Sequence, residues 1–126
     1  MARNVIAVVD DLFFASKIRG AGEQTGIGVT FVKSIADAKR TARDQAADLI
    51  IADMNASCCD AIELARSVKG DAALAALPLL GFFSHVQTEL QEAAKAAGFD
   101  RVLPRSAFTK QLSEILTGTS TGQDTA

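Results

Sequence analysis

The chain has 126 residues, of which 48% are hydrophobic and 22% are charged, which is the size and balance of one globular domain. This composition excludes a chain that is disordered over most of its length. Thirteen Lys and Arg against fifteen Asp and Glu give a net charge of -2, so no overall basic field draws the surface to nucleic acid or to an anionic membrane. We therefore expect a domain that binds neither nucleic acid nor membrane directly.

The cysteines and the N-terminus bear on the cellular compartment. The only two cysteines, Cys58 and Cys59, are adjacent, which excludes a framework of disulfide bonds. The first apolar run ends at Asp10 and is far shorter than the ~18 apolar residues that a membrane span needs. No signal peptide is visible. These features predict a cytoplasmic protein with reduced thiols.

Along the chain, short apolar runs alternate with segments of helical period, the pattern of βα units on a parallel sheet. The first and third runs are apolar throughout, which is typical of strands covered by helices on both faces. From residue 117 onward the chain is polar and has no apolar period. We predict one domain over residues 1–117, a disordered tail or the start of a linker over residues 118–126, and strands at Val5–Val9, Gly28–Val32, Leu49–Ala52, Leu79–Phe83 and Arg101–Leu103.

Helices are predicted between these strands. Three starts are indicated where a serine precedes an Asp or Gln by three residues, because both side chains then reach free backbone N–H groups of the first turn: Ser34 with Asp37, Ser57 with Asp60, and Ser84 with Gln87. Side chains at helical spacing predict three stripes packed on the sheet: Leu64, Ala65 and Val68; Leu90, Ala93, Ala94 and Ala97; Phe108, Leu112, Ile115 and Leu116. The phenylalanines are predicted to be core residues: Phe13, Phe14, Phe82, Phe83, Phe99 and Phe108.

Three aspartates follow two of the predicted strands. Asp10 and Asp11 come after the first strand, and Asp53 comes after the third. Because the carboxyl ends of parallel strands open at the same edge of a sheet, we expect the three carboxylates to converge. Such carboxylates repel one another unless a cation is present, and magnesium, a hard ion that prefers oxygen ligands, fits best. Asp11 also fits a helix cap, but three acidic residues at two strand ends favour a Mg²⁺ site.

Two further residues are placed to assist phosphoryl chemistry at this edge. A carboxylate beside Mg²⁺ can attack a phosphoryl group in line, while a hydroxyl and a cation hold the remaining oxygens. Ser84 follows the fourth strand and Arg105 follows the fifth, so they are candidates for these two roles. Ser84 fits a helix cap equally well, and the two roles can coexist. His85 fits a surface group better than a general base, because no Cys or carboxylate is its neighbour in sequence.

At these positions the chain resembles the receiver domains of two-component response regulators, the family of the chemotaxis response regulator. The likeness covers about residues 4–117. The resemblance implies an α/β fold: a flavodoxin-like, doubly wound, five-stranded parallel sheet of order 2-1-3-4-5 with helices on both faces. The motifs that carry it are Val8-Val9-Asp10-Asp11, Asp48-Leu49-Ile50-Ile51-Ala52-Asp53-Met54, Ala76-Leu77-Pro78-Leu79-Leu80 and Ala96-Ala97-Gly98-Phe99-Asp100.

The resemblance also implies a function. It makes Asp53 the phosphoacceptor and Ser84 the switch hydroxyl, with Mg²⁺ bound by Asp10, Asp11, Asp53 and the backbone carbonyl of Asn55. The implied partners are a sensor histidine kinase or a phosphotransfer protein, and a downstream protein at the face of the fourth helix, fifth strand and fifth helix. A homodimer through that face remains open. The chain would be a signalling switch rather than a turnover enzyme.

The chain departs from the family pattern at several positions. Arg105 stands where the family carries a lysine, and His85 stands where a small residue usually admits phosphate, so His85 is a candidate access gate. Val102 replaces the aromatic residue that switches position. These departures favour a second hypothesis, a pseudo-receiver that binds a partner without being phosphorylated, with Arg105 locked to Asp53 in a bidentate salt bridge. A metal-dependent phosphohydrolase ranks last.

Overall fold

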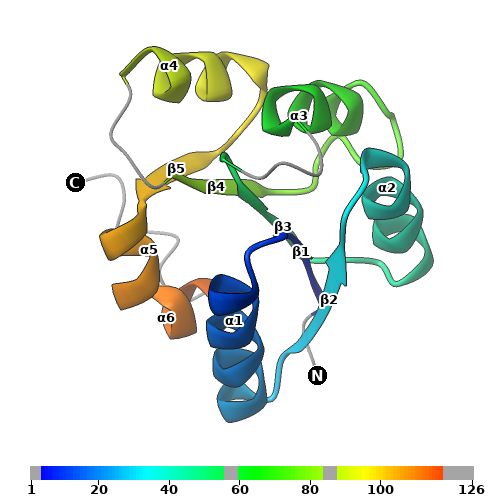
Figure 1. Ribbon diagram of the computed structural model, residues 1–126. Helices are drawn as coiled ribbons and strands as arrows, with labels where there is room; N and C mark the ends of the chain where they lie inside the picture. The colour runs from blue at the N-terminus through cyan, green and yellow to red at the C-terminus, as the bar shows by residue number, and fades with distance from the viewer. Residues whose placement is uncertain (1–3, 56–59, 84–87, 118–126) are drawn as a thin grey trace.

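Five parallel strands form one sheet in the computed structural model, which describes residues 4–55, 60–83 and 88–117 (Figure 1). Their order, β2-β1-β3-β4-β5, confirms the predicted flavodoxin-like topology. The predicted bounds hold for two strands, whereas β1 begins and ends one residue earlier and β3 and β5 each run one residue further. The strands are β1 Asn4–Val8, β2 Gly28–Val32, β3 Leu49–Asp53, β4 Leu79–Phe83 and β5 Arg101–Pro104.

Helices cover both faces of the sheet, which gives three layers (Figure 1). On one face lie α1 (Leu12–Thr25), α5 (Arg105–Lys110) and α6 (Leu112–Thr117). On the other face lie α2 (Ile35–Asp44), α3 (Ala61–Lys69) and α4 (Thr88–Ala97). The segment predicted as one last helix is two short helices that meet at Gln111. Among the helices that the structure describes, none has the length and apolar character to cross a membrane.

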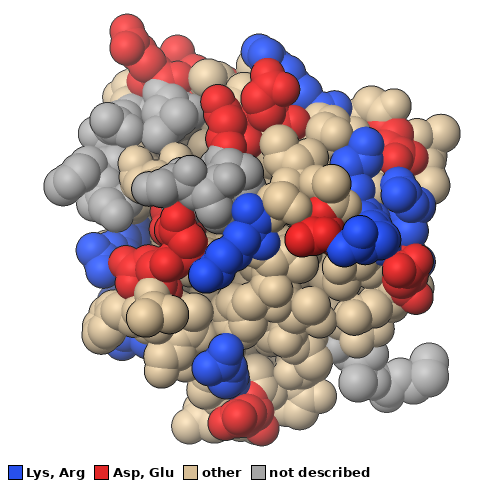
Figure 2. Space-filling view, turned by 45° about the vertical axis from the view of Figure 1, so that its right-hand side comes forward, with Lys and Arg blue, Asp and Glu red and all other residues tan. Residues whose placement is uncertain are grey.

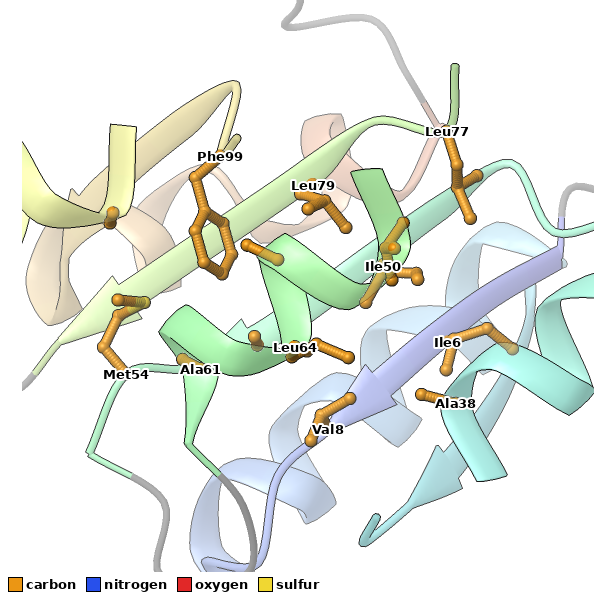
Figure 3. Close-up of a cluster of buried hydrophobic side chains, with 14 of the residues drawn as sticks. Ile6, Val8, Ala38, Ile50, Met54, Ala61, Leu64, Leu77, Leu79 and Phe99 are labelled. Carbon is orange, nitrogen blue, oxygen red and sulfur yellow. The ribbon is translucent and has the colours of Figure 1, made fainter. Parts of the chain in front are cut away.

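Each face of the sheet has its own hydrophobic core, because alternate residues of a strand point to opposite faces. In β1, Ile6 and Val8 pack with α2, α3 and α4, whereas Val5 and Ala7 pack with α1, α5 and α6. Figure 3 shows the first of these cores, with Leu64 of α3 lying over the central strands. Burial on both faces explains why β1 and β3 were recognisable as continuous apolar runs.

The predicted core is mostly confirmed. The last stripe, Phe108, Leu112, Ile115 and Leu116, is buried throughout. Phe13 contradicts its prediction, because its side chain is 59% exposed. Phe14 and Ile18, four residues apart, take the inward face of α1, so the neighbouring Phe13 is rotated to the outside. In α4, Ala94 is buried but Ala93 is exposed, so the inward stripe is narrower than predicted.

The helix starts were predicted with mixed success. Ser34 caps α2, since its Oγ accepts a hydrogen bond from the Asp37 backbone N–H at 3.1 Å, as predicted. The start predicted at Ser57 was wrong. The cap of α3 is Asp60, whose Oδ1 accepts from the Ile62 backbone N–H at 2.8 Å, and Asp serves as well as Ser there. Ser57 itself and the pair of Ser84 with Gln87 lie outside the described residues.

Candidate functional site

The carboxyl edge of the sheet gathers most of the predicted site residues. Asp53 is the last residue of β3, and Asp10 and Asp11 lie between β1 and α1. Arg105 begins α5 directly after β5. Since Val8, the last residue of β1, is the register partner of Ala52, β1 ends one residue before β3 on the neighbouring strand. Asp10, Asp11 and Asp53, which we call the acidic cluster, therefore lie at one edge.

Asp53 is the centre of this site. Its side chain is 8% exposed, and it is the one buried charged side chain in the described part of the chain. Its Oδ1 accepts a hydrogen bond from the Asn55 backbone N–H at 2.8 Å. Burial raises the pKa of the Asp53 carboxyl, and the charges of Asp10 and Asp11 raise this pKa further, while the Asn55 N–H and the Arg105 charge oppose the rise. The acidic cluster and Arg105 thus lie within electrostatic reach of one another.

Asp11 has a second, structural role. Its Oδ1 accepts hydrogen bonds from the backbone N–H groups of Phe13, at 2.9 Å, and Phe14, at 3.4 Å, so Asp11 is the N-cap of α1. The capping role considered from the sequence is therefore real. Across residues 4–55, 60–83 and 88–117, no three His, Cys, Asp or Glu side chains are arranged to hold a metal ion together.

The chemistry of the acidic cluster nevertheless fits Mg²⁺. This ion keeps several of its waters and commonly takes only one or two carboxylates from a protein, so a cage of three side chains is not required. The candidate donors are all oxygen atoms: the carboxylates of the cluster and the Asn55 carbonyl. Burial, and after it the charges of Asp10 and Asp11, raises the pKa of the Asp53 carboxyl, and a bound divalent cation would stabilise the charged form of this carboxyl.

Arg105 does not form the salt bridge with Asp53 that the pseudo-receiver hypothesis assumed. Its guanidinium lies over the Phe14 ring, with Cζ 4.3 Å from the ring centroid. No ion pair of Arg105 with a carboxylate occurs among the described residues. The sequence marked Phe14 only as a core residue. The one sequence signal for a site role was its position three residues after Asp11, in the first turn of α1.

Other predicted site residues are not described. Ser84 and His85 lie between the described ranges, so the switch hydroxyl and the access gate stay predictions. Val102 is 6% exposed in β5 and belongs to the core shared with α2, α3 and α4. It is packed as a structural side chain.

Away from the acidic cluster, charges of opposite sign are intermixed. Figure 2 shows Lys and Arg beside Asp and Glu over one face of the molecule. Asp71, for example, forms ion pairs with Lys39, at 3.5 Å, and with Arg43, at 2.9 Å. Asp71 is thus neutralised by neighbouring cations, whereas two acidic neighbours act on Asp53.

Comparisons with known proteins give two kinds of result. The chain matches no protein-family model and no curated protein sequence. Solved structures of response regulators, in contrast, superpose on nearly the whole chain.

Three of these structures illustrate the likeness. The chemotaxis response regulator CheY4 of Vibrio cholerae has a TM-score of 0.80 at 20% identity, with 94% of this chain and 99% of that chain covered. The phosphorylated cyanobacterial phytochrome response regulator RcpA has a TM-score of 0.75 at 19% identity and covers 95% and 92%. The Mn²⁺-bound response regulator Rcp1 has a TM-score of 0.73 at 14% identity and covers 94% and 92%. The chain therefore has the fold of response-regulator receiver domains.

Proposed function

We propose that this chain is a receiver domain that accepts a phosphoryl group on Asp53. The observation that carries the proposal is the buried Asp53 carboxylate at the end of a central strand, with two more carboxylates and one guanidinium in electrostatic reach. In the proposed step an Asp53 oxygen forms a bond to phosphorus, and the bond from phosphorus to the donor breaks. The donor keeps the electron pair of that bond.

Mg²⁺ completes the proposed site. The ligands would be Asp10, Asp11, Asp53 and the backbone carbonyl of Asn55, and the bound ion would neutralise charge on the phosphoryl oxygens. Arg105 and the Ser84 hydroxyl would hold the remaining oxygens, with His85 beside their access path. Two structural neighbours support this chemistry, since RcpA was solved phosphorylated and Rcp1 with Mn²⁺.

The proposal also names partners. A sensor histidine kinase or a phosphotransfer protein would supply the phosphoryl group in the cytoplasm, so the domain acts as a switch rather than as a turnover enzyme. A downstream protein, or a second copy of the chain, would dock on the face of α4, β5 and α5. The two helices of that face carry exposed charged side chains, including Glu92 and Lys95 of α4 and Lys110 of α5. The domain would comprise residues 1–117, with residues 118–126 as a tail or linker.

Intact-mass analysis tests the proposal. Incubation with acetyl phosphate and Mg²⁺ should add one phosphoryl group to the wild type and none to Asp53→Asn. Asn keeps an oxygen that can accept the Asn55 N–H bond, so this variant is a matched control for folding. Chelation of Mg²⁺ should abolish the modification of the wild type. An unmodified wild type, alongside a receiver domain that is modified in the same buffer, would refute the proposed acceptor.

A phosphorylation-independent interaction module is the second candidate. It is favoured by arginine in place of lysine at position 105, by Pro104 before it, and by His85 in place of a small residue. The two candidates differ in partner binding. An interaction module should bind its partner equally well before and after acetyl phosphate treatment, and equally well as Asp53→Asn.

A further inference from the structure

Two groups that attract a cation lie within reach of the Arg105 guanidinium. One is the face of the Phe14 ring, 4.3 Å from Cζ to the centroid. The other is the acidic cluster, since the Arg105 charge acts on the Asp53 carboxyl. In the described part of the chain Arg105 takes the ring and forms no ion pair with Asp53. The cation therefore rests beside the proposed acceptor without being bound to it.

The Phe14 ring is a fixed platform for this cation. Its side chain is only 3% exposed, and it packs against Phe82 with the ring centroids 5.0 Å apart. Phe82 in turn stacks on Phe108 at 4.2 Å, with the two ring planes 8° apart. Because the ring is buried and packed against other rings, we expect it to keep its place when the guanidinium moves.

The Phe14 ring is also connected to the acidic cluster. Phe82 of β4 is the register partner of Asp53 in β3, so the aromatic stack begins on the strand next to the acceptor. The backbone N–H of Phe14 also donates to the Asp11 carboxylate. The Phe14 ring is thus connected to Asp53 through Phe82 and to Asp11 through its own backbone N–H. A change in the position or tilt of the ring would therefore change where the Arg105 guanidinium lies relative to Asp53.

The Phe14 ring and the Asp53 carboxylate attract the Arg105 guanidinium with comparable strength. A guanidinium over an aromatic face and an ion pair in partly solvated surroundings are interactions of comparable strength. A phosphoryl group carries more charge and more acceptor oxygens than one carboxylate and pairs with a guanidinium through two hydrogen bonds. Phosphorylation of Asp53 would therefore shift this balance away from the ring.

We propose that Phe14 is a positioning residue that holds Arg105 near Asp53 but out of an ion pair with it, and releases Arg105 once a phosphoryl group is present. Asp53 then stays available as a nucleophile, and the cation needs only a short movement to reach the product. The statement about phosphorylation rests on the function proposed above, whereas the resting position of Arg105 does not.

The resting position can be tested without any phosphodonor. The Phe14 ring should shift the NMR signals of the Arg105 guanidinium upfield by its ring current. Phe14→Leu should remove this shift and Phe14→Tyr should keep it. Phe14→Met, which also lacks a ring, replaces Phe14→Leu if that variant does not fold. The matched control is Phe31→Leu, because Arg19 lies over the Phe31 ring at 5.2 Å, whereas Arg105 and not Arg19 is among the charges that act on Asp53. Unchanged Arg105 signals in a folded variant without the Phe14 ring would overturn the proposal.

A double-mutant cycle tests the consequence for phosphorylation. The initial rate with acetyl phosphate and Mg²⁺ should fall about fivefold in Phe14→Leu, the factor expected when an ion pair must first be broken. Phe14→Tyr, which keeps an aromatic ring, should be phosphorylated at the rate of the wild type. In an Arg105→Gln background, the same Phe14→Leu change should alter the rate by less than about twofold, because no cation remains to be positioned.

The outcomes of this cycle are distinguishable. A merely structural role of Phe14 would slow phosphorylation equally in both backgrounds, and that result would overturn the proposal. A wild type that is never phosphorylated would refute the proposed function instead. The NMR comparison would then still decide whether Phe14 holds Arg105.

Discussion

Gly81 of β4 lies so close to Met54 that a Cβ atom at position 81 would stand 2.7 Å from the Met54 Sδ atom. The same Cβ would stand 3.3 Å from the Phe99 ring. Figure 3 shows the Met54 and Phe99 side chains within one core cluster. Met54 directly follows Asp53, so the absence of a side chain at position 81 gives space to the segment that carries the proposed acceptor.

The first prediction follows from this contact. Gly81→Ala should destabilise the protein by about 1–2 kcal/mol, since added atoms in a packed core push side chains from their preferred rotamers. In a Met54→Ala background, Gly81→Ala should cost less than it does in the wild type, because the closest atom is then absent. Urea denaturation of the two single variants and the double variant measures both effects.

A second glycine provides the control. Gly20 lies inside α1, and a Cβ there would meet nothing within 4 Å. Gly20→Ala should therefore stabilise the protein, by roughly 0.5–1 kcal/mol, because alanine loses less entropy in a helix. If Gly81→Ala and Gly20→Ala changed the free energy of unfolding in the same direction, crowding at Met54 would not be the reason for glycine at position 81.

The second prediction separates the two roles of Asp11. Without divalent cations, Asp11→Ala should cost about 1 kcal/mol through loss of the α1 cap, while Asp11→Asn, which still offers a capping oxygen, should cost little. With Mg²⁺, the wild type should gain thermal stability by mass action, and both variants should gain less. Thermal melts with and without Mg²⁺ give the comparison. An Asn variant that responds to Mg²⁺ like the wild type would remove Asp11 from the metal site.

The third prediction concerns pH. The pKa of Asp53 is raised by burial and by its acidic neighbours above its ordinary value of 3.8, so the folded protein binds this proton more tightly than the unfolded chain does. Stability should therefore fall as pH rises through the interval above 3.8. In a chelator, Asp53→Asn should be more stable than the wild type at about pH 7, and the difference should vanish near about pH 4.

Urea denaturation of the wild type and Asp53→Asn at a series of pH values measures this difference, and Asp71 provides a control of opposite sign in the same series. The Ala73 backbone N–H, helped by Lys39 and Arg43, lowers the pKa of Asp71, so the stability that it contributes is lost as pH falls through its folded-state pKa. Asp71→Asn should thus be less stable than the wild type at neutral pH, with the difference closing in acid. If the stability of both variants depended on pH in the same way as that of the wild type, neither carboxylate would have the predicted environment.

The fold could be predicted from the sequence because its signals are local. The continuous apolar run that precedes Asp53 and the serine cap at Ser34 each depend on neighbouring residues only. The α3 start was misplaced because Ser57 and Asp60 are both good caps, and only packing selects between them. Phe13 and Phe14 show the same limit, since adjacent aromatic residues cannot be assigned to the inside or outside before the rotation of the helix is known.

For the candidate site, the sequence could predict which residues lie at the carboxyl edge of the sheet but not their contacts. The acidic cluster follows from strand ends, which the sequence marks clearly. The contact of Arg105 with Phe14 joins residues at opposite ends of the chain and has no local pattern. The position of Arg105 after the last strand, near three carboxylates, suggested a salt bridge. Only the three-dimensional structure shows that the guanidinium lies over the Phe14 ring instead.

The last prediction concerns Arg105→Lys, on which the two candidate functions differ. A lysine has a compact ammonium on a flexible stem and lacks the planar group that stacks on Phe14, so it can approach the Asp53 carboxylate directly. For a working receiver whose arginine already serves as the phosphate-binding cation, phosphorylation of Arg105→Lys should be similar to that of the wild type or lower. A pseudo-receiver locked by Arg105 should instead gain phosphorylation, most of all together with His85→Ala. The measurement is the phosphorylated fraction of each variant at matched acetyl phosphate and Mg²⁺. Because Arg105 lies over Phe14 rather than in an ion pair with Asp53, we expect no gain, and a marked increase in Arg105→Lys would favour the locked pocket.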